Sequence, residues 1–194
     1  MKTNKKIVLV VVFMFGTLFN YANNDKNFNR IVNTTKVEVA FKNAKIGHKL
    51  TIKDDNGTPL HSEIVSKEGN LNKIFDLSSL KDGKYTVELN KDYEIIVKTL
   101  EIKGNKVTFN KNSRKVIFKP VIRNKKNVLM ISKIAFDKKP MKIALYFDNV
   151  IIYSETVESD LILNRTYKLD TKEVGNYKAI IYNNNRSYVH SFKI

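Results

Sequence analysis

The sequence contains no cysteine and no tryptophan, and only three prolines and seven glycines among its 194 residues. The absence of cysteine excludes disulfides, thiolate metal ligands, a cysteine nucleophile and the lipid-modified cysteine of bacterial lipoproteins. The low glycine and proline content excludes a low-complexity or collagen-like chain. Tyrosine and phenylalanine supply all the aromatic residues, and together with a hydrophobic content of 42% they favour β-strands around a packed core.

Only one long hydrophobic run is present, and it lies at the N-terminus. Three lysines within the first six residues precede the 13-residue run Ile7–Phe19, and the small residue Ala22 follows it. A membrane-spanning helix needs about 20 apolar residues, so this arrangement is typical of a secretory signal peptide. We therefore expect residues 1–22 to direct export to the periplasm, the cell surface or the exterior. We expect no transmembrane segment in the mature chain.

One stretch of the sequence recurs 92 residues later. The segment Asp76–Leu89, DLSSLKDGKYTVEL, returns as KLDTKEVGNYKAII at Lys168–Ile181. The register holds without a gap between residues 60–102 and residues 152–194. Repetition over this length indicates a duplicated structural unit.

Both copies alternate as β-strands do. The order apolar, basic, aromatic, apolar occurs at every second position in the first copy and again in the second (Leu71, Lys73, Phe75, Leu77; Leu163, Arg165, Tyr167, Leu169). Upstream, VEVAF at Val37–Phe41 matches SKIAF at Ser132–Phe136. Asn56-Gly57 predicts a hairpin turn with positive φ. No segment shows helical periodicity over three turns, so we expect an all-β fold.

The repeated stretch has the pattern of a corner between two strands. A strand ends at Leu77, a short connection places Leu80 inward, and Gly83 allows a sharp turn into the strand that Tyr85 begins. A buried tyrosine ring with its hydroxyl bonded to upstream backbone is the tyrosine corner of immunoglobulin-like sandwiches. We therefore predict two tandem immunoglobulin-like antiparallel β-sandwich domains after the N-terminal signal peptide.

The repeat places the domains at residues 23–102 and 103–194. The segments NKVTFN (105–110) and RKVIFKPVI (114–122) lie outside the gap-free repeat and are expected to form a further hairpin. The sequence leaves open whether this hairpin begins the second domain or completes the sheet of the first.

The corner residues also carry a resemblance to a known family. The segment Asp76–Tyr85 matches the D-L-S-x-L-x-x-G-x-Y pattern and resembles the C-terminal sorting domains of the type IX (Por) secretion system of Bacteroidetes. The layout is similar to secreted flavobacterial proteins built from two such domains. The resemblance implies small immunoglobulin-like sandwiches that are exported. The terminal copy departs from the pattern, because KLDTKEVGNY lacks the S-x-L element.

Residues suited to catalysis or metal binding are scarce. The only histidines are His48, His61 and His190, and two of them precede a serine on a strand, where neighbouring side chains point to opposite faces. KDDNGT, at residues 53–58, superficially resembles a calcium loop, but its oxygens crowd into the expected hairpin turn. We expect no enzymatic activity, no catalytic residues, no cofactor and no bound metal.

Charge is the unusual feature of the composition. The formal net charge is +16, or +13 without the three lysines of the signal peptide, and residues 102–136 contribute +10 of that without a single acid. This segment suggests a site for an anionic partner, with six candidate contacts: Lys111, Arg114, Lys115, Arg123, Lys125 and Lys126. The alternative is a solvated, lysine-rich edge that discourages aggregation.

The function that follows is an exported, non-enzymatic binding or structural module of the cell envelope or exterior. Its expected partner is a protein or an anionic glycan. The chain has no motif for specific nucleic-acid recognition. The alternative is a type IX secretion cargo whose C-terminal domain acts as a sorting signal.

Overall fold

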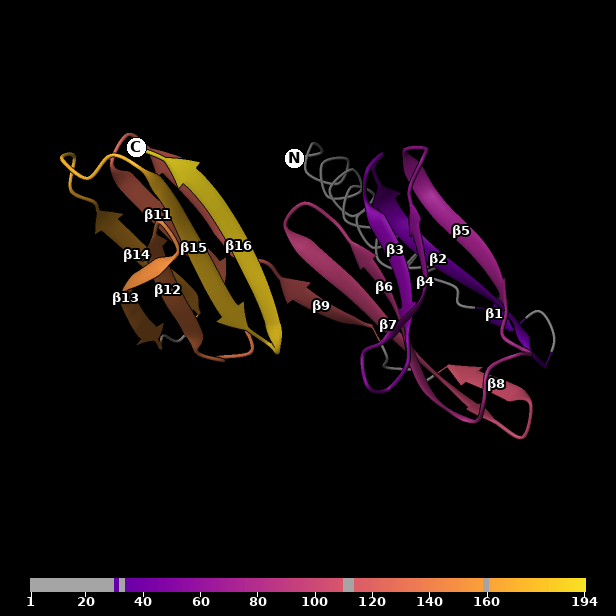
Figure 1. The fold of residues 1–194 in the computed structure, drawn as a ribbon. Coiled ribbons are helices and arrows are strands. Elements are labelled where there is room, and N and C mark those ends of the chain that lie inside the picture. The colour runs from indigo at the N-terminus through magenta and orange to yellow at the C-terminus, as the bar shows by residue number, and fades with distance from the viewer. Residues whose placement is uncertain (1–29, 32–33, 110–113, 159–160) are drawn as a thin grey trace, which may run out of the picture.

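The computed structural model describes residues 30–31, 34–109, 114–158 and 161–194, and these residues form two β-sandwiches (Figure 1). The expected signal peptide, residues 1–22, lies outside the described residues. In the part of the chain that the structure describes, no helix is long and apolar enough to cross a bilayer.

The first sandwich consists of a three-stranded sheet, β1-β2-β5, and a larger sheet in the order β4-β3-β6-β7-β8, with β9 also paired to β7. All neighbouring strands are antiparallel. The strands are β1 (Arg30–Ile31), β2 (Lys36–Ala44), β3 (Lys49–Lys53), β4 (Pro59–Ile64), β5 (Gly69–Asp76), β6 (Gly83–Asn90), β7 (Glu94–Lys103), β8 (Lys106–Phe109) and β9 (Lys115–Phe118).

The second sandwich repeats this plan with the sheets β10-β11-β14 and β13-β12-β15-β16. Its strands are β10 (Val121–Lys125), β11 (Val128–Ile134), β12 (Met141–Phe147), β13 (Val150–Val157), β14 (Ile162–Lys168), β15 (Asn176–Asn183) and β16 (Arg186–Lys193). A sheet of three antiparallel strands packs on a sheet of four, and the third and fourth strands of this sandwich, β12 and β13, lie in the same sheet. Together with the corners described below, this arrangement is an immunoglobulin-like sandwich. The predicted all-β fold class is confirmed.

Strand pairing confirms the 92-residue register from β4 to β7 against β13 to β16, and it corrects the match upstream. Val37 pairs with Phe75, and Leu129 pairs with Tyr167, the residue 92 positions after Phe75. Val37 is therefore equivalent to Leu129. The similarity of VEVAF to SKIAF placed Val37 three residues too late, and this odd shift would put the matched side chains on opposite faces of the sheet.

The two segments expected to form a hairpin with each other do not pair: β8 and β9 each pair with β7 of the first sandwich, and Val121 and Ile122 already belong to β10 of the second. A two-residue turn with positive φ at Gly104 and Asn105 folds β8 back onto β7, and β9 then pairs with the other half of β7. The boundary expected between residues 102 and 103 therefore moves past Phe118. The repeat could not show this, because the matched register ends at residue 102, before β8 begins.

The tyrosine corners are present in both copies. The Tyr85 hydroxyl donates to the Lys81 carbonyl at 2.7 Å, and the Tyr177 hydroxyl donates to the Glu173 carbonyl at 2.8 Å. Both rings are buried. The terminal copy forms its corner without the S-x-L element, so the tyrosine and the packing beneath it are sufficient for this geometry.

Each sandwich has its own hydrophobic core. The larger fully buried side chains of the first are Phe41, Leu50, Leu89 and Leu100, and those of the second are Leu129, Ile131, Met141, Ile143, Leu163 and Ile181. Burial of this kind stabilises each unit by about 25 cal/mol for every Å² of apolar surface removed from water.

The two sandwiches meet at a short junction. Only Lys119 and Pro120 separate β9 from β10, and the Phe118 and Phe136 rings meet edge to face at 5.6 Å. The Arg186 guanidinium donates to the Glu88 carboxylate, which Lys53 of the first sandwich also contacts at 2.8 Å. A charge-assisted contact and an aromatic pair thus both link the two sandwiches and oppose rotation of one against the other.

Candidate functional site

The predicted basic contacts do not form one surface. Lys111 lies outside the described residues. Arg114 and Lys115 lie at the start of β9 in the first sandwich, whereas Arg123, Lys125 and Lys126 lie on β10 and its turn in the second. The β10 strand leads away from the junction, and its turn ends beside the corner of the second sandwich, where the Leu169 amide bonds to the Asn127 carbonyl. The basic segment is therefore divided between two places.

Arg114 contributes to a pocket of about 160 Å³ in the first sandwich. The pocket lies where β2 of one sheet faces β7 of the other, and it is lined by Ala40, Phe41, Lys42, Asn43, Lys91, Glu94, Ile96, Lys98 and Arg114. Four of these side chains are basic and one is acidic. The term basic pocket is used below for this set of residues.

Lys98 is the unusual member of the basic pocket. It occupies the inward row of β7 between Ile96 and Leu100, where an apolar residue is expected, and only 2% of its surface is exposed. Its ammonium donates to the Ala40 carbonyl and lies 4.9 Å from the centre of the Phe41 ring. Burial, with a smaller contribution from Arg114, lowers the pKa of Lys98 from 10.5 to about 8.

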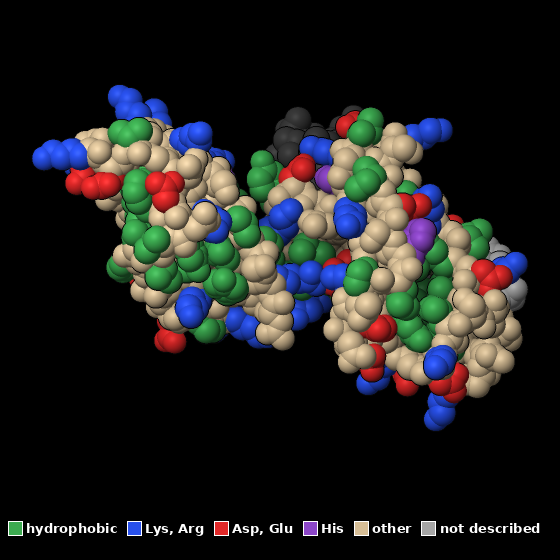
Figure 2. Space-filling model, viewed as in Figure 1, with side chains coloured by type: hydrophobic (Ala, Val, Ile, Leu, Met, Phe, Trp, Pro, Cys, Tyr) green, Lys and Arg blue, Asp and Glu red, His purple; other side chains and the backbone are tan. Residues whose placement is uncertain are grey.

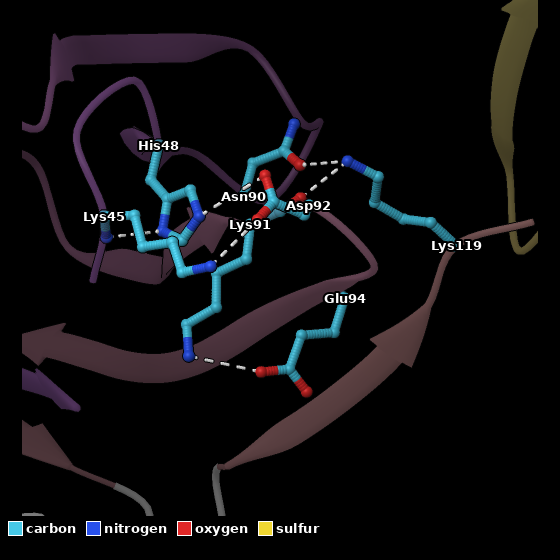
Figure 3. Close-up of polar contacts among 7 residues, drawn as sticks. All are labelled: Lys45, His48, Asn90, Lys91, Asp92, Glu94 and Lys119. Carbon is cyan, nitrogen blue, oxygen red and sulfur yellow. Dashed lines mark hydrogen bonds and ion pairs between the residues drawn. The ribbon is translucent and has the colours of Figure 1, made fainter. Parts of the chain in front are cut away.

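More charges surround the turn between β6 and β7, next to the basic pocket (Figure 3). The Lys91 ammonium contacts Glu94 at 3.2 Å. The Lys119 ammonium donates to the Asn90 side chain at 3.0 Å and to the Lys91 carbonyl at 2.6 Å. Burial lowers the pKa of Lys119, and the nearby Asp92 partly opposes that change. These bonds tie the linker residue Lys119 to the first sandwich.

His48 belongs to the same turn region but is committed to structure. Its Nδ1 atom accepts a hydrogen bond from the Lys45 amide at 3.0 Å, and its Nε2 atom lies 3.7 Å from the Asp92 carboxylate. The Lys45 ammonium lies 3.8 Å from Asp92 on the other side (Figure 3). The ring therefore holds the turn through the Lys45 amide and Asp92.

The basic side chains outnumber the acids at this end of the first sandwich. Two acids, Asp92 and Glu94, lie among six basic residues: Lys42, Lys45, Lys91, Lys98, Arg114 and Lys119. Figure 2 shows Lys and Arg side chains along the boundary between the two sandwiches. A concave site with this excess of positive charge attracts anionic groups, and its partly desolvated walls strengthen that attraction.

The other two histidines have structural surroundings. His61 contacts the Phe75 ring at 5.8 Å, while the neighbouring Ser62 bonds to Thr51 across the sheet. The His190 Nε2 atom lies 2.9 Å from the Asn124 side chain. The prediction that His61 and Ser62 point to opposite faces is confirmed.

The segment that resembles a calcium loop forms a turn. The Asp54 carboxylate accepts a hydrogen bond from the Thr58 amide at 2.7 Å, and Gly57 takes the positive φ of +83°. Among the described residues, no three His, Asp or Glu side chains are grouped to hold a metal ion.

The sequence did not reveal a contact that closes the open side of each sandwich. In the first copy, the Lys73 ammonium on β5 contacts the Glu63 carboxylate on β4 at 3.1 Å, next to the His61–Phe75 ring pair. The contact joins the edge strands of opposite sheets. We call this arrangement the edge clasp.

The second copy repeats the edge clasp 92 residues later. Arg165 on β14 contacts Glu155 on β13 at 3.1 Å, and the Tyr153 and Tyr167 rings lie 5.7 Å apart. The Tyr167 hydroxyl donates to Glu155 at 2.6 Å. This bond lowers the pKa of Glu155, and burial followed by the same bond raises the pKa of Tyr167. The 92-residue repeat made the basic and aromatic residues of the edge clasp visible in the sequence. The acids of the clasp lie on a different strand, and the sequence repeat does not show which strands lie opposite each other.

No protein-family model and no curated protein matches the chain. Solved structures with some similarity include the human OSCAR ligand-binding domain, at 10% identity and a TM-score of 0.25 over 84% of this chain and 92% of that chain. Another is a chimeric titin Z1Z2 tandem, at 12% identity and a TM-score of 0.24 over 82% and 90%. A biofilm-associated protein BSP domain matches at 11% identity and a TM-score of 0.29, over 84% of this chain and 27% of that one.

Proposed function

We propose that this chain is an exported, non-enzymatic tandem immunoglobulin-like module of the cell envelope or exterior that binds an anionic glycan. The observation that carries the proposal is the basic pocket, where a buried lysine remains in a hydrophobic row. An apolar residue would fit that row at lower cost, so a cation kept at this position supports the proposal of an anionic partner. The signal-peptide pattern at residues 1–22 supports export.

The mode of binding follows from how the charges are held. Lys91 is paired with Glu94, and Lys98 is fixed between the sheets, so both are preorganised. Arg114 lies at the mouth of the pocket on an exposed segment. A sulfate or carboxylate group of a glycan suits this arrangement, because guanidinium and ammonium groups donate to its oxygens. The contacts at the junction then hold the second sandwich next to the first while the polymer is bound.

The proposal is tested by elution from immobilised heparin in a salt gradient, with residues 23–194 as the protein. Replacing Lys42 and Arg114 by glutamine should lower the salt concentration needed for elution, because both line the basic pocket. The matched control replaces Lys125 and Lys126 by glutamine and removes the same charge at the far end of the second sandwich. Equal shifts for the two pairs would mean that net charge alone governs retention, and the pocket would have no part in binding.

A second candidate function is secretion cargo of the type IX system. Its support is the resemblance of Asp76–Tyr85 to sorting domains and the intact corner of the terminal sandwich. We rank it second, because the terminal copy lacks the S-x-L element that the internal copy keeps. Residues 119–194 fused behind a periplasmic reporter should not reach the cell surface of a Bacteroidetes host. Surface delivery that is abolished by deleting Ser191–Ile194 would reverse the ranking.

A further inference from the structure

The outer face of the four-stranded sheet in the second sandwich is apolar although it faces solvent. Alternate residues of β12 and β15 form the core, so the residues between them and their cross-strand partners point outward. Figure 2 shows hydrophobic side chains spread over this sandwich, and Tyr182 and Val189 are 42% and 60% exposed. The term apolar face is used below for Ala144, Tyr146, Ile151, Ile180, Tyr182 and Val189.

The first sandwich shows that the fold does not require apolar residues at these positions. The same sheet of the first sandwich has polar residues where the apolar face has apolar or aromatic ones. Strand pairing gives four equivalent positions, with the first sandwich named first: Thr51 and Ala144, Lys53 and Tyr146, Glu88 and Ile180, Asn90 and Tyr182. A solvent-facing apolar patch that the fold does not require marks a contact surface.

Basic residues border the apolar face, and the four strands place no acid on it. Lys142, Lys178 and Lys193 occupy outward positions on β12, β15 and β16. The only acid of the four strands is Glu155, which turns inward to contact Arg165. The Lys178 ammonium lies 4.9 Å from the centre of the Tyr146 ring. This distribution of charge is complementary to an anionic partner.

We propose that the apolar face is a second contact surface for an anionic glycan. A sugar ring packs its C–H groups on aromatic and apolar side chains, while its sulfate or carboxylate groups bind lysine ammonium groups. Tyr146 and Tyr182 lie on neighbouring strands, four residues apart along the strand direction, which corresponds to roughly 14 Å. The face is therefore long enough for a short oligosaccharide. The ligand class rests on the proposed function, whereas the position of this surface does not.

Hydroxyl groups along the two edge strands favour a sugar over a lipid surface. Ser154 and Thr156 on β13 and Ser187 and Ser191 on β16 are exposed and point to the same side as the apolar face. Each hydroxyl can donate to a sugar hydroxyl and accept from another. In contact with hydrocarbon the same groups would lose their water without gaining a partner.

The test is calorimetric titration of residues 23–194 with a defined heparin oligosaccharide at low and high salt. Tyr182→Ala should weaken binding by about fivefold and keep that loss at high salt, because salt does not screen an apolar contact. Tyr182→Phe keeps the ring and should bind as the wild type does. Val174→Ala is the control for loss of an exposed apolar side chain elsewhere on this sandwich and should also bind normally. Unchanged thermal melts confirm that each variant is folded.

The double substitution of Lys42 and Arg114 by glutamine separates this inference from the proposed function. Its loss of affinity should shrink at high salt, because the contact it removes is ionic. Normal binding by Tyr182→Ala together with weaker binding by the double variant would overturn the apolar face alone, and normal binding by both would overturn both surfaces. Sedimentation of the wild-type chain with anionic phospholipid vesicles that Tyr182→Ala abolishes, with oligosaccharide affinity unchanged, would assign the face to a membrane and also overturn the proposal.

Discussion

Replacing Lys98 by methionine should stabilise the first sandwich. The lysine is buried in the hydrophobic row of β7, and its pKa falls from 10.5 to about 8. Each unit of pKa shift corresponds to about 1.4 kcal/mol. The shift of Lys98 therefore sets an upper bound of roughly 3 kcal/mol on the cost of keeping its ammonium charged in the folded state. Methionine has a similar unbranched shape but loses the bond to the Ala40 carbonyl, so we expect the free energy of unfolding to rise by about 1–2 kcal/mol at pH 7.

The effect must depend on pH in one direction. Because the pKa of Lys98 is lower in the folded state, the unfolded chain binds more protons between pH 8 and pH 10.5, and the wild-type chain gains stability as pH rises through that window. The advantage of Lys98→Met should therefore shrink by about 2 kcal/mol between pH 7 and pH 9.5.

Urea unfolding followed by circular dichroism measures this change, since the chain has no tryptophan. Lys125→Met, at an exposed position on β10, should change neither stability nor its pH dependence. Destabilisation by Lys98→Met at pH 7, or an advantage independent of pH, would refute the assignment of Lys98 as a costly buried cation.

Four further substitutions, at three positions, test the fold and the junction. Tyr85→Phe should lower the free energy of unfolding by about 1 kcal/mol through the lost hydroxyl bond, and Tyr85→Ala by about 3–5 kcal/mol, as thermal melts will show; unchanged melts would contradict the corner. Gly175→Ala should cost about 1–3 kcal/mol in urea unfolding, because the new methyl carbon would lie 2.6 Å from the Phe147 ring; a neutral result would place that ring elsewhere. Arg186→Ala should broaden the interdomain distances seen by small-angle scattering, while each sandwich loses less than about 1 kcal/mol, since Lys53 still pairs with Glu88. An unchanged scattering profile would show that the other junction contacts suffice.

The fold was predictable where local pattern and repetition agreed. The alternation of side chains predicted β5 and β14, and the Tyr85 corner, repeated 92 residues later, predicted the turns. Strand periodicity and turn chemistry are local properties, so the sequence alone shows them. The placement of β8 and β9 was not predictable, since either sheet offered an edge of the same chemistry. The choice depends on the two-residue turn at Gly104, which folds β8 back onto β7.

The candidate site was predictable only in part. Charge counting identified Arg114, but it grouped that residue with Lys125, which lies on the other sandwich. Counting along the chain cannot tell which strands of a sandwich face each other. Lys98 was missed because a single lysine in a strand normally points to solvent, and its burial depends on β2 lying across from it. The signal that would have identified Lys98 is a basic residue at a strand position where the alternation pattern predicts an inward-facing apolar residue.

The most direct test of the proposed function is the affinity of residues 23–194 for a defined sulfated oligosaccharide at pH 7 and pH 9.5, at constant ionic strength. Lys98 loses its proton between these values, so the affinity of the wild-type chain should fall by about tenfold. Lys98→Met should bind about tenfold more weakly at pH 7 and show no such fall, whereas Lys125→Met should behave as the wild type does. A wild-type affinity that is independent of pH, or a Lys98→Met chain that binds as tightly as the wild type at pH 7, would contradict the basic pocket as the binding site.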